Sequence, residues 1–344
     1  MKIATFNVNS IRKRLPIVLD WLDRHKPDVL CLQETKVQDA EFPLLALTEA
    51  GYAVSFRGIK GYNGVAVLSR TKPDAVFYGF DDNGDPDDSR LMRVIVRGIP
   101  IINTYVPQGY QIDSPKYAYK LRWFDRLRRY FAKHLSPEQP AIWCGDMNVA
   151  PRPIDVHSPE KHLKHVCYHQ DARKAYEEAV KWGWQDVFVK LYPERQQYTF
   201  WDYRAPSSLE ANKGWRIDHI LATAPLAATC VRRTWTSRRG ARRILRITPF
   251  CGRSSPSRTS RIDWLQVLNE QEAIGRRGLA ERKKEVDIGL RGAKDSSDRT
   301  IVSGEEFGLS RSAMSTQRGG LRQGRRRSSP APIRHLKPRS RLAA

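Results

Sequence analysis

The sequence predicts an α/β fold, and within that class an α/β sandwich. Three patterns support this prediction in the chain of 344 residues. Short apolar runs bounded by turn residues are typical of buried strands, and longer segments between them carry apolar side chains at helical spacing. Strands also follow one another in pairs instead of always alternating with helices, which indicates mixed sheets flanked by helices.

The expected elements can be taken in order along the chain. Residues 2–9 alternate between apolar and polar side chains and predict a first strand. Asn9 and Ser10 can cap a helix whose apolar face begins at Ile11. The apolar run 29–32 predicts a central strand, because a strand covered on both faces needs no polar positions. Further strands are expected over 52–56, 64–69, 91–96, 100–106, 141–148, 198–203 and 215–222, and further helices over 41–50, 116–135 and 172–181.

The stretch 141–148 is the most informative of these strands. Four apolar residues lead into Gly145, and Asp146 and Asn148 follow two residues apart. Side chains alternate along an extended chain, so Asp146 and Asn148 are expected to point the same way. Gly145 leaves room for a substrate or a metal ion to approach the backbone. Taken alone, the pattern fits a strand ending in a turn rich in Asp and Asn equally well.

Composition argues against a membrane-spanning or secreted protein and shows where the basic charge lies. The chain has no run of about 18 apolar residues, so no transmembrane helix is expected, and its first residues lack the shape of a secretion signal. Five scattered cysteines suit a reducing cytoplasm better than a disulfide framework. Of the net charge of +23, +18 falls in residues 231–344 and +5 in residues 1–230, so the strong basicity does not describe the globular part.

Several predicted strands end in polar side chains that suit a hard metal ion. These side chains belong to Asn7, Glu34, Tyr105, Asp146, Asn148 and Asp218. Oxygen ligands of this kind favour Mg²⁺ or Mn²⁺ over softer metals. Such an ion can neutralise and orient a phosphate. In that setting Asp146 is suited to take a proton from water, Asn148 to stabilise developing negative charge, and Tyr105 to donate to a phosphate or a leaving oxygen.

Five motifs in this order resemble one family, the bacterial exonuclease III group of DNA-repair nucleases in the endonuclease/exonuclease/phosphatase superfamily. They begin with Phe6-Asn7-Val8-Asn9-Ser10-Ile11-Arg12 and Leu32-Gln33-Glu34-Thr35-Lys36. The third is Asn103-Thr104-Tyr105-Val106-Pro107-Gln108-Gly109, and the fourth runs from Gly145 to Pro151. The fifth is Trp201-Asp202-Tyr203-Arg204 followed by Arg216-Ile217-Asp218-His219. The resemblance covers about residues 1–230.

The resemblance implies a four-layer α/β sandwich and Mg²⁺-dependent cleavage of DNA phosphodiester bonds, with Mn²⁺ as an alternative ion. It implies a metal site formed by Asn7, Glu34, Asp146 and Asn148. It further implies that Tyr105 contacts the scissile phosphate, Asp146 activates water, Asn148 stabilises the transition state and Asp218 belongs to the catalytic group. By the same resemblance Gln108, Lys116 and Trp201 contact DNA.

Other interpretations remain open at this point. Superfamily relatives that cleave phosphoinositides or sphingomyelin share the core, although 107–109 and 201–204 favour DNA. A non-catalytic basic DNA-binding protein is a further alternative. The cluster His157, His162, His165, Cys167 and His169 could be a zinc site, but its spacing matches no standard pattern and a solvated loop near DNA is preferred. The basic residues Lys116, Lys120, Arg122, Arg126, Arg128 and Arg129 could touch phosphates, although a solvated helix face is the simpler interpretation.

The family pattern is incomplete at the C-terminal end. The family ends with a Ser-Asp-His motif, whose histidine pairs with the equivalent of Asp218, and a last core strand. No Asp-His pair follows Asp218-His219, and His219 should face away from Asp218 because strand neighbours point to opposite faces. In a shifted reading frame Trp235-Thr236 must encode Asp, and residues 244–248 can encode Pro-Ser-Asp-His. We therefore hypothesise that the chain from about Val231 is translated out of frame.

These arguments give a two-part organisation. Residues 1–230 are expected to form a catalytic domain that lacks its last strand, and residues 231–344 a basic, Arg- and Ser-rich tail that is disordered. Loss of a catalytic acid–base group typically costs ~10²–10⁴-fold in rate, so impaired activity is expected. The expected partner is double-stranded DNA with abasic sites or 3′ ends, acted on by a cytoplasmic monomer.

Overall fold

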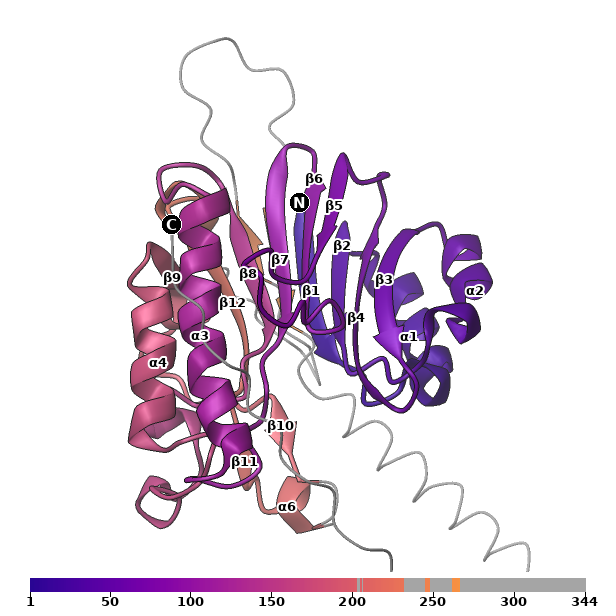
Figure 1. Cartoon of the computed structure of the whole chain (residues 1–344). Coiled ribbons are helices and arrows are strands. Elements are labelled where there is room, and N and C mark those ends of the chain that lie inside the picture. Colours follow the sequence, from indigo (N-terminus) through magenta and orange to yellow (C-terminus); the bar gives the residue numbers. More distant parts are fainter. Residues whose placement is uncertain (203–204, 206, 232–244, 248–261, 267–344) are drawn as a thin grey trace, which may run out of the picture. The chain divides into compact units, whose positions relative to one another are not determined.

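Two β-sheets packed face to face form the centre of the protein, and helices cover their outer faces (Figure 1). The structure is a computed structural model that describes residues 1–202, 205, 207–231, 245–247 and 262–266. In this part of the chain no helix is long and apolar enough to cross a membrane.

The first sheet has the strand order β13-β14-β15-β1-β2-β4-β3. Its strands β1 and β2 run parallel, and β2, β4 and β3 pair antiparallel. The strands are β1 (Lys2–Asn7), β2 (Val29–Gln33), β3 (Ala53–Ile59), β4 (Tyr62–Ser69), β13 (Cys230–Val231), β14 (Leu245–Ile247) and β15 (Ile262–Gln266).

The second sheet has the order β5-β6-β7-β8-β12-β9. Its strands are β5 (Ala75–Tyr78), β6 (Leu91–Val96), β7 (Ile99–Tyr105), β8 (Ile142–Asp146), β12 (Asp218–Thr223) and β9 (Trp184–Asp186). Strands β7 and β8 are parallel neighbours, whereas β12 pairs antiparallel with β8. A separate hairpin of β10 (Phe200–Trp201) and β11 (Gly214–Trp215) lies beside the carboxyl end of β8.

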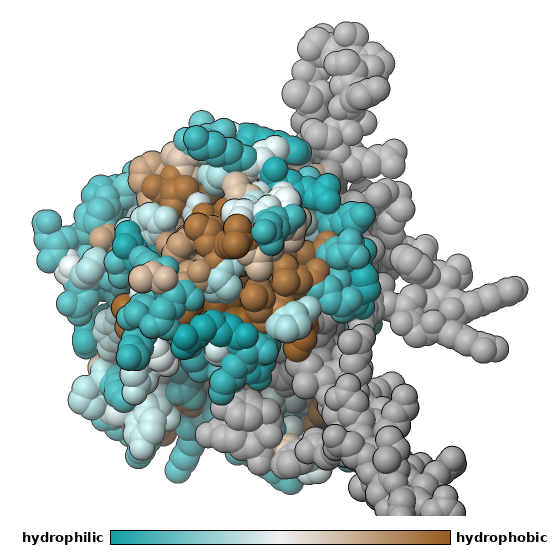
Figure 2. All heavy atoms as spheres, turned by 90° about the vertical axis from the view of Figure 1, so that its right-hand side faces the viewer, coloured by the Kyte–Doolittle hydropathy of each residue, from teal (hydrophilic) through white to brown (hydrophobic). Residues whose placement is uncertain are grey.

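The helices complete four layers, as the resemblance implies. Helices α1 (Ile11–His25) and α2 (Leu44–Glu49) share an apolar cluster with the first sheet. Helices α3 (Pro115–His134) and α4 (Gln170–Val180) do the same with the second sheet, and a third cluster fills the space between the sheets. Figure 2 shows apolar side chains among hydrophilic ones on the face that carries α1 and α2. Shorter helical segments are η1 (Asp39–Glu41), η2 (Pro153–Asp155), η3 (Pro159–Lys161), α5 (Val187–Leu191), α6 (Ser207–Glu210) and α7 (Ala224–Ala227).

A buried polar bridge fixes the two sheets relative to each other. Asn103 of β7 donates through Nδ2 to the carbonyl oxygens of Leu32 and Ala66 in the first sheet, each at 3.0 Å. Gln33 of β2 donates through Nε2 to Asn103 Oδ1 (2.6 Å) and to Thr5 Oγ1 (2.9 Å). Buried hydrogen-bonded networks specify one arrangement of a core. The bridge lies one residue before Glu34 and two before Tyr105, so it sets the separation of these candidate site residues.

The structure differs from the sequence-based prediction in several elements. Strands β5 and β9 and helix α5 were not expected, and Ser10 makes no side-chain cap hydrogen bond to α1. The predicted domain had no strand after Val231, but the structure has β14 and β15 there. Strand β15 pairs parallel to β1, and it therefore occupies an edge that would otherwise expose unpaired backbone groups. The hypotheses on disorder and reading frame were made for residues 231–344, of which 232–244, 248–261 and 267–344 lie outside the described residues.

Candidate active site

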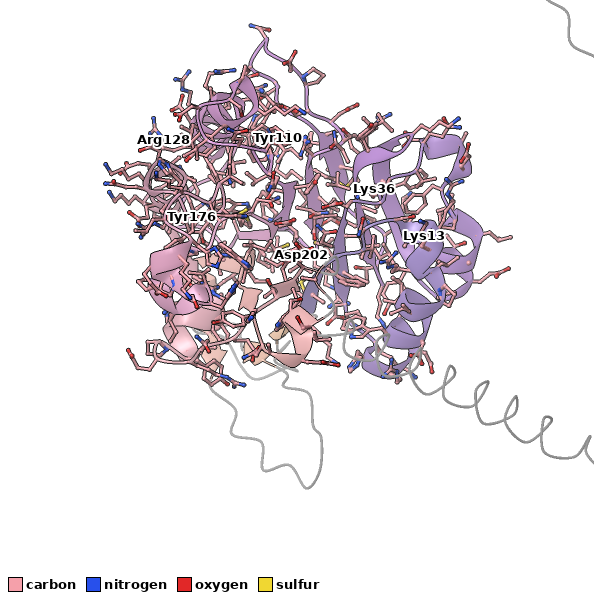
Figure 3. All side chains as sticks on the ribbon, turned by 90° about the horizontal axis from the view of Figure 1, so that it is seen from below. Lys13, Lys36, Tyr110, Arg128, Tyr176 and Asp202 are labelled. Atoms are coloured by element: carbon pink, nitrogen blue, oxygen red, sulfur yellow. The ribbon has the colours of Figure 1, made fainter. Side chains whose placement is uncertain are left out.

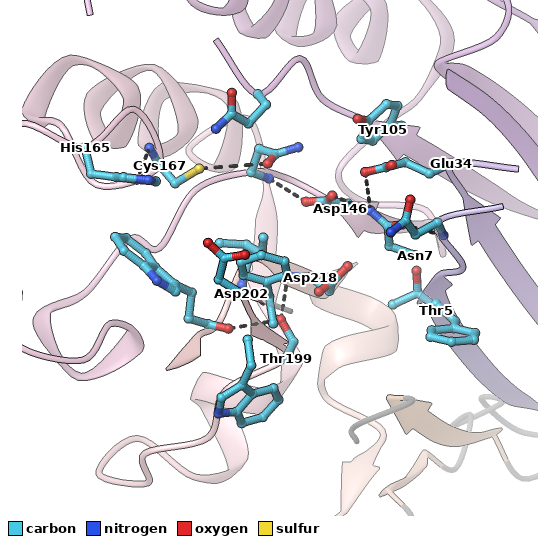
Figure 4. A pocket seen from close by; sticks show the side chains of 18 of the residues that line it. Thr5, Asn7, Glu34, Tyr105, Asp146, His165, Cys167, Thr199, Asp202 and Asp218 are labelled. Carbon is cyan, nitrogen blue, oxygen red and sulfur yellow. Dashed lines mark hydrogen bonds between the residues drawn. The ribbon is translucent and has the colours of Figure 1, made fainter. Parts of the chain in front are cut away.

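The ends of five strands from both sheets meet at one pocket (Figure 4). Asn7 and Glu34 lie where β1 and β2 end, and Tyr105 and Asp146 end β7 and β8. Asp218 begins β12, which runs in the opposite direction, so it arrives at the same edge. Nine residues were predicted for the site from the sequence, and eight of them line the pocket: Asn7, Glu34, Tyr105, Gln108, Asp146, Asn148, Trp201 and Asp218.

Asp146 is the centre of the hydrogen bonding in this pocket. Its Oδ2 accepts from Asn7 Nδ2 (2.9 Å), and its Oδ1 accepts from the backbone N–H of Asn148 (2.9 Å). The same Asn7 amide donates to Glu34 Oε1 (2.8 Å). Asn148 in turn donates through Nδ2 to the Val106 carbonyl (2.9 Å). One amide therefore joins two carboxylates that lie far apart in sequence.

Glu34 is held from its other side by Lys36. The Lys36 ammonium lies 2.6 Å from Glu34 Oε2 and donates to Asn9 Oδ1 at 2.6 Å. Glu34 and Lys36 both have a positive φ, of 52° and 51°, which is uncommon for residues other than glycine. The positive φ values show that the turn after β2 is held in a demanding conformation by its contacts. In Figure 3, which views the molecule from below, Lys36 and Asp202 lie toward the middle and Arg128 lies at the periphery.

Crowding of carboxylates shapes the electrostatics. Burial, followed by Asp218 and Glu34, raises the pKa of Asp146 well above its usual range. Burial, with a further contribution from Glu34, raises the pKa of Asp218 to about 7, although the Thr199 hydroxyl acts in the opposite direction. Buried carboxylates that repel one another favour a bound cation, because the cation replaces the missing compensation for their charge.

Tyr105 completes the polar side of the pocket. Burial, and then the carboxylates of Glu34 and Asp146, raise the pKa of its phenol far above the usual range. The Arg90 guanidinium lies 4.7 Å from the centroid of the Tyr105 ring, and Arg90 Nη1 donates to the Tyr105 carbonyl at 3.2 Å. Tyr105 is therefore a fixed hydrogen-bond donor that stays protonated.

His219 faces away from the pocket, as predicted from its position beside Asp218. It is completely buried, its Nδ1 lies 2.8 Å from Tyr176 Oη, and its Nε2 lies 3.0 Å from the Val149 carbonyl oxygen. Burial, followed by the nearby Arg216 charge, lowers the pKa of His219 to about 4. A buried, neutral histidine behind the strand cannot replace a catalytic histidine in the pocket.

The donor set fits a hard divalent cation. Among the residues that the structure describes, no three His, Cys, Asp or Glu side chains converge closely enough to hold a metal ion by themselves. Glu34 and Asp146 are instead joined by Asn7, and Asn148 lies beside them, so any set would combine carboxylate and amide oxygens. Such oxygens suit Mg²⁺ and Mn²⁺.

Aromatic and apolar side chains line the opposite wall. They are Phe200, Trp201, Trp215 and Ile217, which come from the β10–β11 hairpin and the segment before β12. Only Trp201 among them was predicted as a site residue. Thr199 was also missed: its hydroxyl accepts from the backbone N–H groups of Ile217 and Asp218, each at 3.1 Å. Single hydroxyl and aromatic residues outside the recognised motifs carried no signal in the sequence.

Gln108 and Lys116 were both predicted to contact DNA, but only Gln108 lies at the pocket. Gln108 is exposed at the pocket, where its Oε1 accepts from Tyr110 N at 2.8 Å. Lys116 is exposed on the first turn of α3 but is not among the pocket-lining residues, and its ammonium lies 5.4 Å from the Tyr110 ring centroid. Lys116 is thus placed beside the pocket and not in it.

Gly145 serves a purpose other than the one predicted. A Cβ at this position would lie 2.1 Å from the Thr104 carbonyl oxygen, and its φ is +133°. The space is therefore needed by the neighbouring strand β7, and no substrate or metal needs to occupy it. The interpretation of Gly145 as an opening for ligands is wrong for this reason.

The loop before α4 and the basic face of α3 also differ from prediction. His165 and Cys167 line the pocket, and the rings of His157, His162 and His165 surround Trp215, so this loop is not merely solvated. Lys120 is completely buried instead of lying on a solvated helix face. Trp184 is buried in the apolar cluster between α3, α4 and the second sheet, and Trp182 packs partly buried against that cluster.

The four layers and the carboxylate-, amide- and phenol-lined pocket define a phosphoesterase of the α/β-sandwich class. The chain matches the model of the Endonuclease/Exonuclease/phosphatase family over residues 4–278 and belongs to that family. Within it, the chain is an exodeoxyribonuclease III-like hydrolase, and enzymes of this kind depend on a divalent metal. The match extends beyond residue 230, where the resemblance had been placed to end.

Individual relatives agree with this assignment. Exodeoxyribonuclease III of Haemophilus influenzae is 30% identical over 243 residues, covering 67% of this chain and 91% of that protein. The DNA repair nuclease APEX1 of Danio rerio is 32% identical over 240 residues, covering 67% and 76%. An AP endonuclease structure from Archaeoglobus fulgidus matches with a TM-score of 0.66 and 53% identity, covering 67% of this chain and 89% of that one.

Proposed function

We propose that this protein is a DNA-repair nuclease that hydrolyses phosphodiester bonds at abasic sites and at 3′ ends, with Mg²⁺ as its ion. The observation that carries the proposal is the convergence of Asn7, Glu34, Tyr105, Asp146, Asn148 and Asp218 at one pocket beside an aromatic wall. The relatives named above include nucleases for such DNA. An exposed pocket rim that carries Gln108 and a nearby Lys116 suits a DNA backbone better than a small phosphorylated molecule.

Each residue has a role that its contacts support. Glu34, Asp146, Asn7 and Asn148 would hold the ion, which supplies charge neutralisation at the phosphate. Asp146 is positioned by Asn7 and the Asn148 N–H to accept a proton from the attacking water. The Tyr105 hydroxyl donates to the phosphate, and the Asn148 amide stabilises its developing negative charge. Asp218 shares the buried carboxylate cluster, and Trp201 and Gln108 contact DNA.

The cellular setting is part of the proposal. Cys31, Cys144 and Cys167 are buried free thiols, which agrees with a reducing cytoplasm. We place the protein there as a monomer that acts on chromosomal DNA. We also retain the hypothesis that the sequence from about Val231 is read out of frame.

The test is cleavage of a duplex with one abasic site, measured with Mg²⁺ and again with EDTA. The chain is compared with a version whose end is restored to the alternative frame and with Asp146→Asn in each background. Cleavage that needs Mg²⁺ and Asp146 supports the proposal. Salt-sensitive binding without cleavage by either version would instead favour a non-catalytic DNA-binding protein, and cleavage of phosphoinositides alone would favour a lipid phosphatase.

If only the restored version cuts, the Asp-His pair encoded in the other frame is needed for activity. Equal cleavage by both versions would refute the expectation that this chain is impaired by the missing Asp-His pair. In that case the residues present in this chain suffice for catalysis.

A further inference from the structure

Lys120 of α3 is a charged residue buried in the protein interior. Its side chain is 0% exposed. Its Nζ donates to the carbonyl oxygens of Gln108 (3.1 Å), Asn148 (2.8 Å) and Val166 (2.7 Å). An ammonium has three protons, so these three hydrogen bonds use all of them. The arrangement satisfies the group fully.

The burial of this charge is costly. Burial lowers the pKa of Lys120, although Cys167 and Asp146 act in the opposite direction. Transfer of an ammonium from water to the interior costs free energy, and its three carbonyl partners supply hydrogen bonds but no opposite charge. An apolar side chain would fill the same space without that penalty. The charge is therefore explained better by what it holds than by a gain in stability.

The three carbonyls belong to three separate loops around the pocket. Gln108 lies in the loop after β7 and Asn148 in the turn after β8, and both line the pocket. Val166 lies between His165 and Cys167, which line it as well. The loop at Gln108 sits directly on the Lys120 stem, since a Cβ added to Gly109 would lie 3.2 Å from Lys120 Cδ. One ammonium thus joins three walls of the site.

The hydrogen bond from Lys120 stabilises the backbone conformation of Asn148. Its φ is 49°, a left-handed conformation that needs support from its surroundings. Its N–H donates to Asp146, its side-chain amide donates to Val106, and its carbonyl accepts from Lys120. Without the ammonium, the third of these restraints is lost and the peptide after Asn148 can rotate.

We propose that Lys120 is a positioning residue, which holds the Gln108, Asn148 and Val166 loops in register so that the Asn148 amide meets the scissile phosphate. This inference rests on the proposed function of Asn148. Lys120 acts from behind the pocket wall, through Asn148, and does not touch DNA.

The test uses Lys120→Met, which keeps the length and removes the charge, alone and combined with Asn148→Ala. The measurement is the single-turnover rate of cleavage of abasic DNA at saturating enzyme, with DNA affinity measured separately in EDTA. We expect Lys120→Met to slow cleavage by about 10- to 100-fold, with DNA affinity changed less than about threefold. In the Asn148→Ala background the same substitution should change the rate by less than about threefold, because residues that act as a unit are not additive.

Lys120→Gln, which keeps two N–H donors, should lose less activity than Lys120→Met. Lys133→Met is the matched control, since Lys133 lies on the same helix with a 57% exposed side chain. Full additivity of Lys120→Met with Asn148→Ala, or an unchanged rate in Lys120→Met, would overturn the inference.

A second measurement is independent of activity and separates this inference from the proposed function. Amide hydrogen exchange in Lys120→Gln should accelerate at residues 106–110, 146–150 and 165–168 together, and not in β2 or α1. If the parent chain cuts no DNA, the proposed function fails while this measurement still decides whether Lys120 joins the loops. Unchanged exchange in all three segments would refute the role of Lys120.

Discussion

Asp146 and Asp218 lie directly opposite each other on the antiparallel strands β8 and β12. Facing like charges on neighbouring strands destabilise a sheet. Burial then adds to the penalty, and the pKa values of both carboxyl groups are raised as a result. The site is thus built at the expense of stability.

Replacing Asp146 by asparagine should abolish cleavage and stabilise the metal-free protein. The substitution removes the proton acceptor, for which a loss of at least ~10²–10⁴-fold is typical. It also removes a buried charge whose pKa is raised, so the melting temperature in EDTA at pH 8 should increase. The check is calorimetry beside cleavage assays, with Asp125→Asn on the surface of α3 as the control. A lower melting temperature in EDTA would contradict the electrostatic account.

Replacing Tyr105 by phenylalanine should reduce the rate of cleavage by about 10²-fold, the scale typical of a lost donor to developing charge. Because the pKa of the Tyr105 phenol is raised, it remains protonated throughout the range in which the protein is folded. The pH–rate profile of the unmodified site should therefore show no tyrosine titration on its alkaline side. Tyr110→Phe is the control, since Tyr110 is 72% exposed. Equal losses in the two variants would exclude a specific role for the Tyr105 hydroxyl.

A buried ionic network behind the site should make the fold sensitive to acid. Burial alone would raise the pKa of Asp155, but the guanidinium groups of Arg216 and Arg152 outweigh it and lower that pKa to about 2. Arg216 Nε and Nη2 donate to Asp155 at 2.8 and 3.1 Å, and Nη1 donates to Asp186 at 2.7 Å. A carboxyl with a lowered pKa contributes stability that is present above the unfolded pKa of about 3.9 and is lost as the pH falls through about 2.

Arg216→Met should therefore cost about 3–5 kcal/mol in the free energy of unfolding at pH 7, because it leaves buried carboxylates uncompensated. The difference from the parent chain should shrink as the pH is lowered from about 4 toward 2. Urea unfolding at a series of pH values measures both effects. A constant difference across that range would show that Asp155 is not the titrating partner.

Gly145→Ala should destabilise the fold by about 3 kcal/mol or more, since its Cβ would overlap the Thr104 carbonyl of β7. Gly98 is the matched control, with a φ of +72° and no heavy atom within 4 Å of an added Cβ. Gly98→Ala should show only the conformational penalty of about 1 kcal/mol. Urea unfolding of both variants separates the overlap from the backbone strain, and equal losses would rule out the overlap.

The sequence predicted the central strands and most of the pocket because these carry local signals. The run 29–32 and the stretch 141–148 are apolar enough to identify buried strands, and the polar ends of those strands give Glu34 and Asp146. Short edge elements such as β9 have too few residues for a periodic pattern. Their position is fixed by pairing with β12 and not by their own residues.

The errors concerned residues whose role depends on distant partners. Lys120 has helical spacing that suits a solvated face, and only the carbonyls of three loops explain its burial. Gly145 looked like an opening for ligands because the neighbouring strand β7 cannot be seen from the sequence around it. Thr199 carries no motif, and its contact with the N–H of Asp218 spans 19 residues.

The hydrogen bond between Asn7 and Asp146 joins residues that are 139 positions apart in the chain. Asp218 enters the same pocket after a further 72 positions. Strands with such distant partners pair late, because the intervening chain must first be made and then brought together. During synthesis Asn7 therefore leaves the ribosome well before Asp146 and Asp218 have been made. A nascent nuclease of this design is therefore harmless to nearby nucleic acid until nearly all of its sandwich has been translated.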